Sequence, residues 1–394
     1  MTYSVSWQAG PSAQIELFSP DVSDTGSGGS YHFKFSPPMR KTLRPPLAEL
    51  ILGDGELEPI NQELTRLIGF ADGRGPPPAG AGEEADIVER TRRIGNILHN
   101  LVIPPDVQAE LSAPELFVEF GLDERLLEYP WELLYDGQHF LGCRHAMGRF
   151  VNVTKPSIPN SVRPQLPDNG PLSVLLISVP NPMPRPGTPP VIYSALSGAQ
   201  AETAMIAQVL TVPDVELTIL AGVQASWNNV LNEINGPKRF HIVHYNGHAY
   251  FDRTNPKKSS LVLHDKDMST SFIQGLLSRK PPLFFFVNAC ETAMANAERP
   301  WKDRYDIFGL ARAFLDTGAY LLGTRWTVGD GMAARFAEVF YGGMLKGTPL
   351  GSAIRDARCA CFDAAMQSNR DDFSWASYSY YGDPRLVFRK GPTH

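Results

Sequence analysis

Two residues in the second half of the chain could together carry out nucleophilic chemistry. His248 follows the mainly apolar stretch 240–243, and Cys290 follows the apolar stretch 283–287. A thiol becomes a strong nucleophile at neutral pH when a neighbouring base takes its proton or when its pKa is lowered. The sequence therefore contains a candidate nucleophile and a candidate base about 40 residues apart.

The stretches before these residues predict the elements that position them. Both are short, continuous apolar runs that end in small and polar residues, and runs of this kind are typical of central strands in a parallel sheet. In such sheets the functional groups lie just beyond the carboxyl ends of the strands. We therefore expect His248 and Cys290 in adjacent loops at one edge of a sheet.

Strand and helix patterns alternate through the whole second half of the chain. Strands are predicted at 172–179, 215–220, 240–243, 283–287, 319–324 and 384–388, and helices at 194–210, 227–234, 307–315, 332–345 and 350–365. Repeated alternation indicates βαβ units. The fold class is thus predicted to be α/β, with a mostly parallel, doubly wound sheet flanked by helices.

The first half of the chain has a different, α+β pattern. A hairpin is predicted from 12–20 and 31–36, helices at 47–68, 85–101 and 129–134, and short strands at 116–120, 139–141 and 148–153. The segment 73–84 is rich in Pro and Gly and predicts a surface loop. Residues 154–171 contain five prolines and predict a linker. The predicted domains are 1–153, the linker 154–171, and 172–394.

Composition limits the classes of function. The chain has 394 residues, 43% of them hydrophobic, and a net charge of −6, which argues against direct nucleic-acid binding. No cysteine has zinc-ligand spacing, so we expect no metal and no cofactor. The N-terminus lacks signal-peptide features, and no apolar stretch reaches the ~20 residues needed to cross a membrane. A soluble cytoplasmic protein is the prediction. The four cysteines are Cys143, Cys290, Cys359 and Cys361.

Several motifs together resemble the CHAT domain, a family of caspase-like cysteine peptidases related to separases, gingipains and metacaspases. They are HYNGHAYFD (244–252), FFFVNACETA (284–293), the segment 309–330, YYGDPRLVF (380–388) and YPWELLYDGQHFLG (129–142). The resemblance covers about residues 115–390. It implies a caspase-like sheet in the second half, and a pseudo-caspase or regulatory extension in residues 1–153.

The resemblance also implies a catalytic pair. By position, Cys290 corresponds to the nucleophile and His248 to the general base and acid, while the backbone N–H groups of Cys290 and Ala249 would face the developing oxyanion. Two positions depart from the family pattern. Asn288 stands where Ser is more frequent, and Ala249 stands where Gly is frequent.

Substrate specificity is a further expectation from the resemblance. In separases an acidic residue after the Trp-containing strand contacts a basic P1 side chain, and Asp330 in the segment 326–330 matches it. A buried carboxylate favours the rigid guanidinium of Arg over Lys. Asp303 and Asp306 are alternative substrate-binding residues. A P1 Arg preference is therefore a hypothesis.

The function implied is a cysteine endopeptidase that cleaves a specific protein partner, with gated activity in bacterial defence or programmed cell death. The implied partners are a protein substrate, such as a gasdermin-like pore former or another effector encoded nearby, and an activating sensor protein or complex. The alternative is a catalytically idle caspase-like scaffold that binds proteins. A different hydrolase or acyltransferase with the same pair is the third reading, but no other motif supports it.

Other residues that could be functional have simpler structural interpretations. His244 either shapes the site or is a buried structural residue. Glu202, on the predicted helix 194–210, is expected to be exposed to solvent or to cap the helix. Cys359 and Cys361 lie on a predicted helix and are expected to be inert.

Overall fold

The computed structural model describes residues 3–18, 30–36, 47–51, 54–71, 87–123, 126–127, 129–151, 170–187, 190–250, 258–277, 280–289, 314–315, 317–368 and 372–390. The chain divides into two compact units. The first unit comprises residues 1–6, 157–348 and 387–394, and the second unit comprises residues 7–156 and 349–386.

Each unit is built from separate stretches of the chain. Residues 349–386, which the predicted boundary places with 172–348, lie in the same compact unit as residues 7–156. They form the helix α10 (Leu350–Ser368), which packs against the strand β6 (Ala146–Val151), and the strand β15 (Tyr378–Tyr381), which pairs with β6. The division into a regulatory region, a linker and a protease domain remains a prediction.

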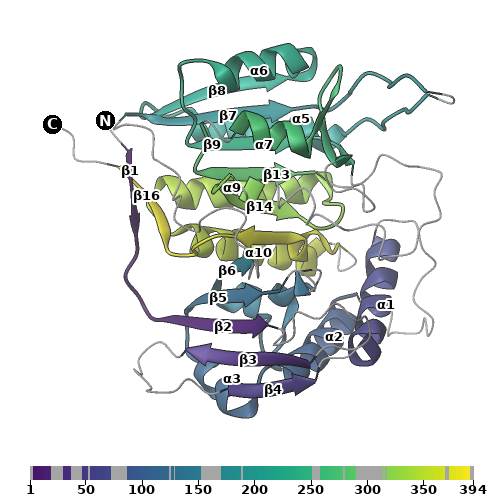
Figure 1. Ribbon diagram of the computed structural model, residues 1–394, viewed down its shortest axis with the longest axis vertical. Helices are drawn as coiled ribbons and strands as arrows, with labels where there is room; N and C mark the ends of the chain where they lie inside the picture. Colours follow the sequence, from purple (N-terminus) through teal and green to yellow (C-terminus); the bar gives the residue numbers. More distant parts are fainter. Residues whose placement is uncertain are drawn as a thin grey trace. The chain divides into compact units, whose positions relative to one another are not determined.

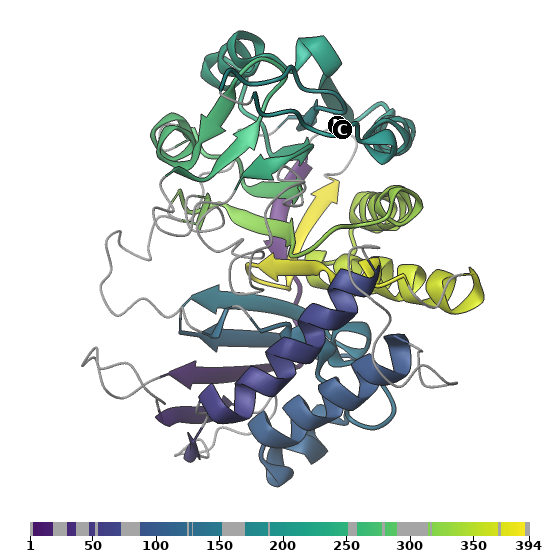
Figure 2. The same ribbon diagram turned by 90° about the vertical axis from the view of Figure 1, so that its right-hand side faces the viewer.

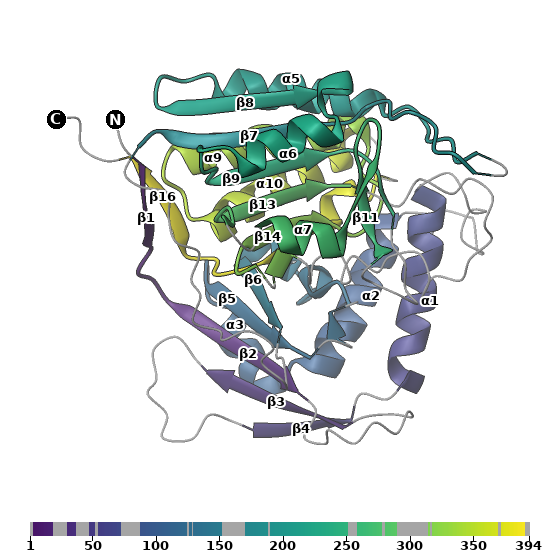
Figure 3. The same ribbon diagram turned by 45° about the horizontal axis from the view of Figure 1, so that its top comes forward.

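The first unit is a parallel sheet with helices on both faces. Its strand order is β8-β7-β9-β13-β14, and every neighbouring pair is parallel (Figure 3). The strands are β7 (Leu172–Ser178), β8 (Val215–Ala221), β9 (Ile242–Asn246), β13 (Phe284–Asn288) and β14 (Tyr320–Thr324). The helices α5 (Ser197–Leu210) and α9 (Asp330–Leu345) cover one face, and α6 (Trp227–Asn235) and α7 (Thr270–Leu277) cover the other (Figure 2).

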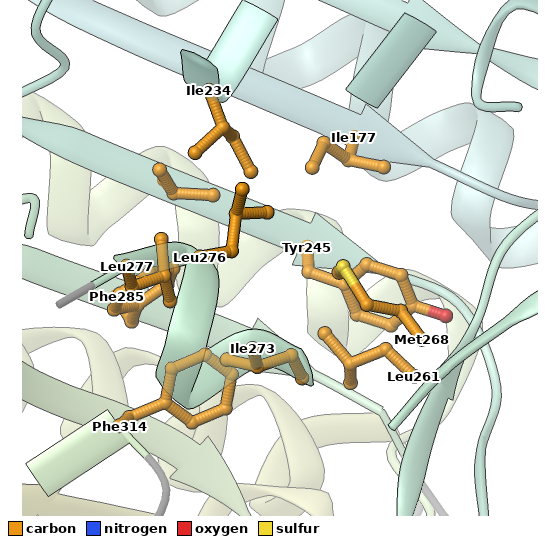
Figure 4. Close-up of a pocket in the computed structure, with 11 residues that line it drawn as sticks. Ile177, Ile234, Tyr245, Leu261, Met268, Ile273, Leu276, Leu277, Phe285 and Phe314 are labelled. Atoms are coloured by element: carbon orange, nitrogen blue, oxygen red, sulfur yellow. The ribbon is translucent and has the colours of Figure 1, made fainter. Parts of the chain in front are cut away.

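Burial explains why the apolar runs form the middle of this sheet. Every residue of β7, β9 and β13 is buried, whereas the edge strand β8 is mostly exposed or half-buried. Apolar side chains of β9 and β13 line a pocket with side chains of α6 and α7 (Figure 4). The predicted parallel, helix-flanked sheet is confirmed, and so is the adjacency of β9 and β13.

Short strands add to the first unit. A small antiparallel sheet, β10 (Ala249–Tyr250), β11 (Ser260–Val262) and β12 (Asp267–Ser269), begins close behind β9. The strand β1 (Tyr3–Trp7) pairs with β16 (Leu386–Lys390). The pattern predicts β16 but not β1. It also does not predict β10, β11 and β12, because strands of two or three residues have no period that can be recognised.

The second unit is a mixed sheet of order β4-β3-β2-β5-β6-β15 (Figure 1). The strands β2, β3 and β4 are antiparallel, and β2, β5, β6 and β15 are parallel. The strands not yet given are β2 (Ser12–Phe18), β3 (Ser30–Ser36), β4 (Leu47–Ile51) and β5 (Phe117–Leu122); the helices are α1 (Asp54–Ala71), α2 (Ile87–Val102), α3 (Pro105–Leu111) and α4 (Leu141–Arg144).

Three predicted elements in this unit are wrong or incomplete. The range 47–68 begins as the strand β4, because its pairing with β3 outweighs the local helical spacing. Residues 139–141 are no strand: α4 begins at Leu141, and Phe140 makes only an isolated bridge with Tyr135. The predicted helix 129–134 is a single 3-10 turn at Trp131–Leu133.

Some predictions lie outside the described residues. They are the loop 73–84, nearly all of the linker 154–171, and most of the helix 307–315. Among the residues that the structure does describe, no helix is long and apolar enough to cross a membrane.

Candidate active site

The strand order of the first unit marks one position as a natural binding crevice. In chain order the strands run 2-1-3-4-5 across the sheet, so the connections leave in opposite directions between β7 and β9. In open α/β sheets ligands bind at such a switch point, outside the carboxyl ends of the strands. The loops that follow β7 and β9 therefore form the expected site, and His248 lies in the second of them.

The register of the strands places the ends of β9 and β13, which precede the two predicted residues, opposite each other. Asn246 ends β9 and pairs with Asn288, which ends β13. His248 follows two residues after Asn246, and Cys290 follows two residues after Asn288. Cys290 itself lies just beyond the described residues, as do residues 291–313, including Asp303 and Asp306.

The loop after β7 holds the His248 ring. His248 is 0% exposed, and its Nε2 lies 2.8 Å from the carbonyl oxygen of Ser194. The ring centroid of Tyr193 lies 5.4 Å from the imidazole centroid. The Leu196 N–H donates to the Pro180 carbonyl at 2.9 Å, which fixes the base of this loop. The imidazole is thus oriented by backbone and packing from a different strand.

These contacts define the state of the imidazole. A carbonyl oxygen only accepts, so Nε2 carries the proton toward Ser194, and in the neutral ring Nδ1 holds the lone pair. Burial lowers the pKa of His248 below the ordinary 6.5, opposed by the hydrogen bond to Ser194. His248 is therefore neutral at pH 7, which is the state of a general base.

Tyr245 fixes the backbone around His248. The Tyr245 hydroxyl donates toward the carbonyl oxygens of His248 at 2.6 Å and Val262 at 2.8 Å. Tyr245 also lines the apolar pocket beside Met268 (Figure 4). A Cβ on Gly247 would lie 2.5 Å from the Tyr245 hydroxyl oxygen, so the turn between strand and histidine requires glycine.

The end of β13 is held by two neighbours. Thr324, which ends β14, uses its hydroxyl twice: it accepts from the Ala289 N–H and donates to the Ala289 carbonyl, both at 3.2 Å. The Gly247 N–H donates to the Asn288 carbonyl at 3.2 Å. The backbone directly before Cys290 is therefore fixed to β14 on one side and to the histidine turn on the other.

A buried carboxylate lies beneath both strand ends. Glu202 on α5 is 1% exposed, and its Oε2 accepts from the side-chain amides of Asn246 at 2.7 Å and Asn288 at 2.8 Å. Its Oε1 lies 3.2 Å from Nε2 of the buried His244, at an angle that is not that of a hydrogen bond. The expectation that Glu202 is exposed or caps a helix is therefore wrong.

His244 belongs to the same polar cluster. Its Nδ1 lies 3.0 Å from the hydroxyl of Tyr341 on α9, and its ring packs on Phe286. Burial, followed by the charge of Glu202, raises the pKa of the Tyr341 hydroxyl well above its ordinary value. Tyr341 therefore stays protonated. The two ring nitrogens of His244 lie next to Tyr341 and Glu202 inside the protein. These positions favour the structural interpretation of His244.

The other predicted site residues lie in defined places. Ala249 is buried at the start of β10. Asp330 begins α9, and its carboxylate accepts from the Ser197 hydroxyl at 2.6 Å. Asp330 is exposed, whereas the expected preference for Arg at P1 assumes a buried carboxylate. Within the described part of the chain, no group of three or more His, Cys, Asp or Glu side chains is arranged to hold a metal ion.

The sequence interpretation did not single out Tyr193, Ser194 or Thr324. Ser194 acts through its backbone carbonyl, for which the side-chain sequence gives no signal. Thr324 closes a predicted strand, and a polar residue at a strand's carboxyl end in an α/β sheet is a signal that could have found it.

Two solved structures resemble the fold of this chain. The separase–securin complex of Saccharomyces cerevisiae matches 95% of this chain with a TM-score of 0.53 at 11% identity, and this chain covers 30% of that one. The Arg-specific cysteine proteinase gingipain R matches 85% of this chain, with a TM-score of 0.41 at 12% identity and 76% of its own length covered. The match to separase shows that the two chains share a fold.

The family follows from the sequence itself. The profile of the CHAT domain matches residues 92–383, and the chain belongs to the CHAT domain family. The predicted family is confirmed, and family and fold together indicate a protein of the cysteine-peptidase type. No curated protein matches the sequence.

Proposed function

We propose that this chain is a cysteine endopeptidase in which the His248 imidazole activates the Cys290 thiol. The observation that carries the proposal is the register of β9 and β13, in which Asn246 pairs with Asn288. Residues that follow paired positions of parallel neighbours leave the sheet on the same edge. His248 and Cys290 each follow by two residues, which supports a meeting of their side chains at the switch point.

The state of His248 supports its role as the base. With Nε2–H directed at the Ser194 carbonyl, the lone pair of Nδ1 accepts the thiol proton. The thiolate sulfur forms a bond to the scissile carbonyl carbon, and the carbonyl π electrons move to oxygen. When the C–N bond breaks, His248 returns the proton to the leaving amine. Water then hydrolyses the thioester and restores the thiol.

The direction of the Ala249 N–H supports a proposed role as an oxyanion donor. The Val262 N–H donates to the His248 carbonyl at 3.0 Å, while Ala249 pairs with Leu261. Positions alternate along an antiparallel pair, so Ala249 occupies the non-hydrogen-bonded position and its N–H points away from β11. This direction is consistent with donation to an oxyanion, together with the N–H of Cys290.

We further propose a basic P1 preference, with Asp330 as the acceptor and Asp303 and Asp306 as alternatives. The contact between Asp330 and Ser197 shows that the carboxylate accepts hydrogen bonds on the exposed start of α9. A peptide library varied at P1 tests this directly. Preference for Arg, reduced by Asp330→Ala, is the expected result, and a preference for apolar P1 residues contradicts it.

The biological setting is part of the proposal. A protease with a preformed base requires control, and we propose a gated effector in bacterial defence or programmed cell death that cleaves a protein encoded nearby, in the cytoplasm. A sensor protein or complex would release its activity. Cleavage of a neighbouring gene's product by wild type but not by Cys290→Ala is the expected outcome.

Thiol labelling separates the peptidase from an idle scaffold. Iodoacetamide alkylation of Cys290, followed by peptide mass mapping, measures the reactivity of the thiol without any substrate. His248→Ala should lower this rate at neutral pH and lower peptide cleavage by about 100-fold to 10,000-fold, as loss of a general base does. Equal alkylation in wild type and His248→Ala would support the scaffold instead.

A further inference from the structure

We infer that Glu202 is a positioning residue that fixes the distance between the two strands leading to His248 and Cys290. This inference rests on the proposed function. It starts from one carboxylate oxygen, Oε2, that accepts from the side chains of both Asn246 and Asn288. These asparagines are the last residues of β9 and β13, and they are paired in the sheet.

The contact is selective for the ends of the strands. Backbone hydrogen bonds fix β9 and β13 along their length, and beyond the end of β9 the Gly247 N–H still donates to the Asn288 carbonyl at 3.2 Å. Glu202 adds a side-chain link at that point, from the helix that covers this face. The Asn246 amide also reaches the Ala199 carbonyl on the same helix at 3.1 Å. The helix α5 therefore holds the end of β9 twice.

Burial makes this link strong and its loss costly. Glu202 is 1% exposed, Asn246 3% and Asn288 8%. Buried hydrogen bonds to a charged acceptor are stronger than neutral ones, and a buried amide left without its acceptor carries the full desolvation penalty. Without the carboxylate, the Nδ2 groups of Asn246 and Asn288 would lose their shared acceptor, and the strand ends would separate or rotate.

The same region of chain also orients His248. Ser194, three residues before α5 begins at Ser197, supplies the carbonyl that fixes the imidazole. One segment, 194–202, therefore touches the His248 ring, the end of its strand and the end of the strand before Cys290. A shift of α5 changes all three together. Small shifts matter, because misplacing reacting groups by about 1 Å can lower a rate about 100-fold.

Three variants on α5 distinguish positioning from general stability. Glu202→Gln keeps one oxygen that can accept from both amides, so Cys290 alkylation should stay within a few-fold of wild type. Glu202→Ala removes the acceptor, and alkylation should fall by roughly 10-fold to 100-fold. Ile206→Ala, a buried apolar residue one turn further along, is the matched control. It should lower the melting temperature and leave the alkylation rate unchanged.

A charge exchange provides a variant that does not depend on a deletion. Asn288→Asp places a second carboxylate beside Glu202, at the present 2.8 Å contact, and should reduce alkylation strongly. Adding Glu202→Gln restores a donor–acceptor pair and should recover most of the rate. No recovery, with the double variant folded by circular dichroism, would count against a role for this contact.

The outcomes separate this inference from the proposed function. If wild-type alkylation does not depend on His248, the proposed function is overturned, and the role of Glu202 with it. If it does depend on His248 but is unchanged in Glu202→Ala, only the positioning role is overturned. Equal losses in Glu202→Ala and Ile206→Ala, or in Glu202→Ala and Glu202→Gln, also overturn it.

Discussion

At the scale of single residues, the site depends on how tightly each group is held. His248 is fixed by a carbonyl at Nε2, by the Tyr193 ring and through its own carbonyl by Tyr245. The first two contacts come from the loop after β7, and the third comes from β9. A general base requires several such contacts, because its lone pair must already be oriented toward the proton when the substrate binds.

Gly247 is the residue where this arrangement is most easily disturbed. Gly247→Ala would place a Cβ 2.5 Å from the Tyr245 hydroxyl oxygen and 3.2 Å from the Val179 Cβ, so the hydroxyl must leave the His248 carbonyl. We expect peptide cleavage to fall by at least about 10-fold, because a small displacement of the base lowers the rate. Gly342→Ala on α9 meets no atom within 4 Å and is the control. Equal activity in both variants would argue against this strain.

The lowered pKa of His248 predicts the acid limb of the activity profile. The base must be neutral, and burial holds the pKa of His248 below its ordinary 6.5. The profile of kcat/KM against pH, measured with a cleavable peptide, should therefore rise with a midpoint below 6.5 and stay high at pH 7. A midpoint above 6.5 would show that burial does not control this group.

At the scale of elements, close packing of α5 and α9 sets the position of the helix that carries Glu202. A Cβ on Gly198 would lie 2.6 Å from the Asp330 Cα and 2.5 Å from its carboxyl carbon. Gly198→Ala must push the two helices apart and should destabilise the protein by about 1–3 kcal/mol. Because α5 moves, Cys290 alkylation should fall too. Urea unfolding and alkylation measure the two effects, and wild-type values in both would be inconsistent with this packing.

The second unit has its own buried ionic link between elements. Arg149 on β6 and Glu132 in the turn Trp131–Leu133 are 1% and 2% exposed and form a bidentate pair, with Nε donating to Oε1 at 2.9 Å. Arg149 also donates to the Leu127 carbonyl at 3.1 Å. The pair fixes the turn Trp131–Leu133 to β6.

Removing one partner of the Arg149–Glu132 pair should lower the free energy of unfolding more than removing both partners. Arg149→Met leaves the Glu132 carboxylate buried without its cation, and we expect a loss of about 3–5 kcal/mol in the free energy of unfolding. Arg149→Met with Glu132→Leu removes both charges and should recover much of this loss. Urea titration of the two variants measures it. Equal stability of the single and double variants would mean that the pair contributes no charge coupling.

At the scale of the whole molecule, the sheet of the first unit follows from its sequence, but the completion of the site does not. Long apolar runs predict β7, β9 and β13 and the adjacency of β9 and β13. The burial of Glu202 could also have been predicted, because Ala199, Glu202, Ile206 and Leu210 lie on one face of α5 at helical spacing. The role of the Ser194 carbonyl could not be predicted, because side-chain types do not indicate which backbone groups form hydrogen bonds. The placement of α10 in the second unit could not be predicted either, because it depends on tertiary packing with β6.

Each unit contains a buried histidine that should make the whole protein sensitive to acid. Burial lowers the pKa of His145 in the second unit and of His241 in the first from 6.5 to about 4. The Nδ1 of His241 accepts from the Ser173 N–H at 3.0 Å, and the Nδ1 of His145 accepts from the Leu116 N–H at 3.3 Å. A proton at either nitrogen would set two donors against each other.

The sign of the effect follows from which state binds the proton. Between pH 6.5 and about 4 the unfolded chain protonates these two rings while the folded protein does not. The free energy of unfolding should therefore fall as pH falls through this window, by up to about 3 kcal/mol for each histidine. His241→Asn keeps an acceptor for Ser173 and does not titrate, so urea unfolding at a series of pH values should show a shallower slope, and a second change, His145→Asn, should flatten it further. An unchanged slope in the double variant would show that other groups control acid unfolding.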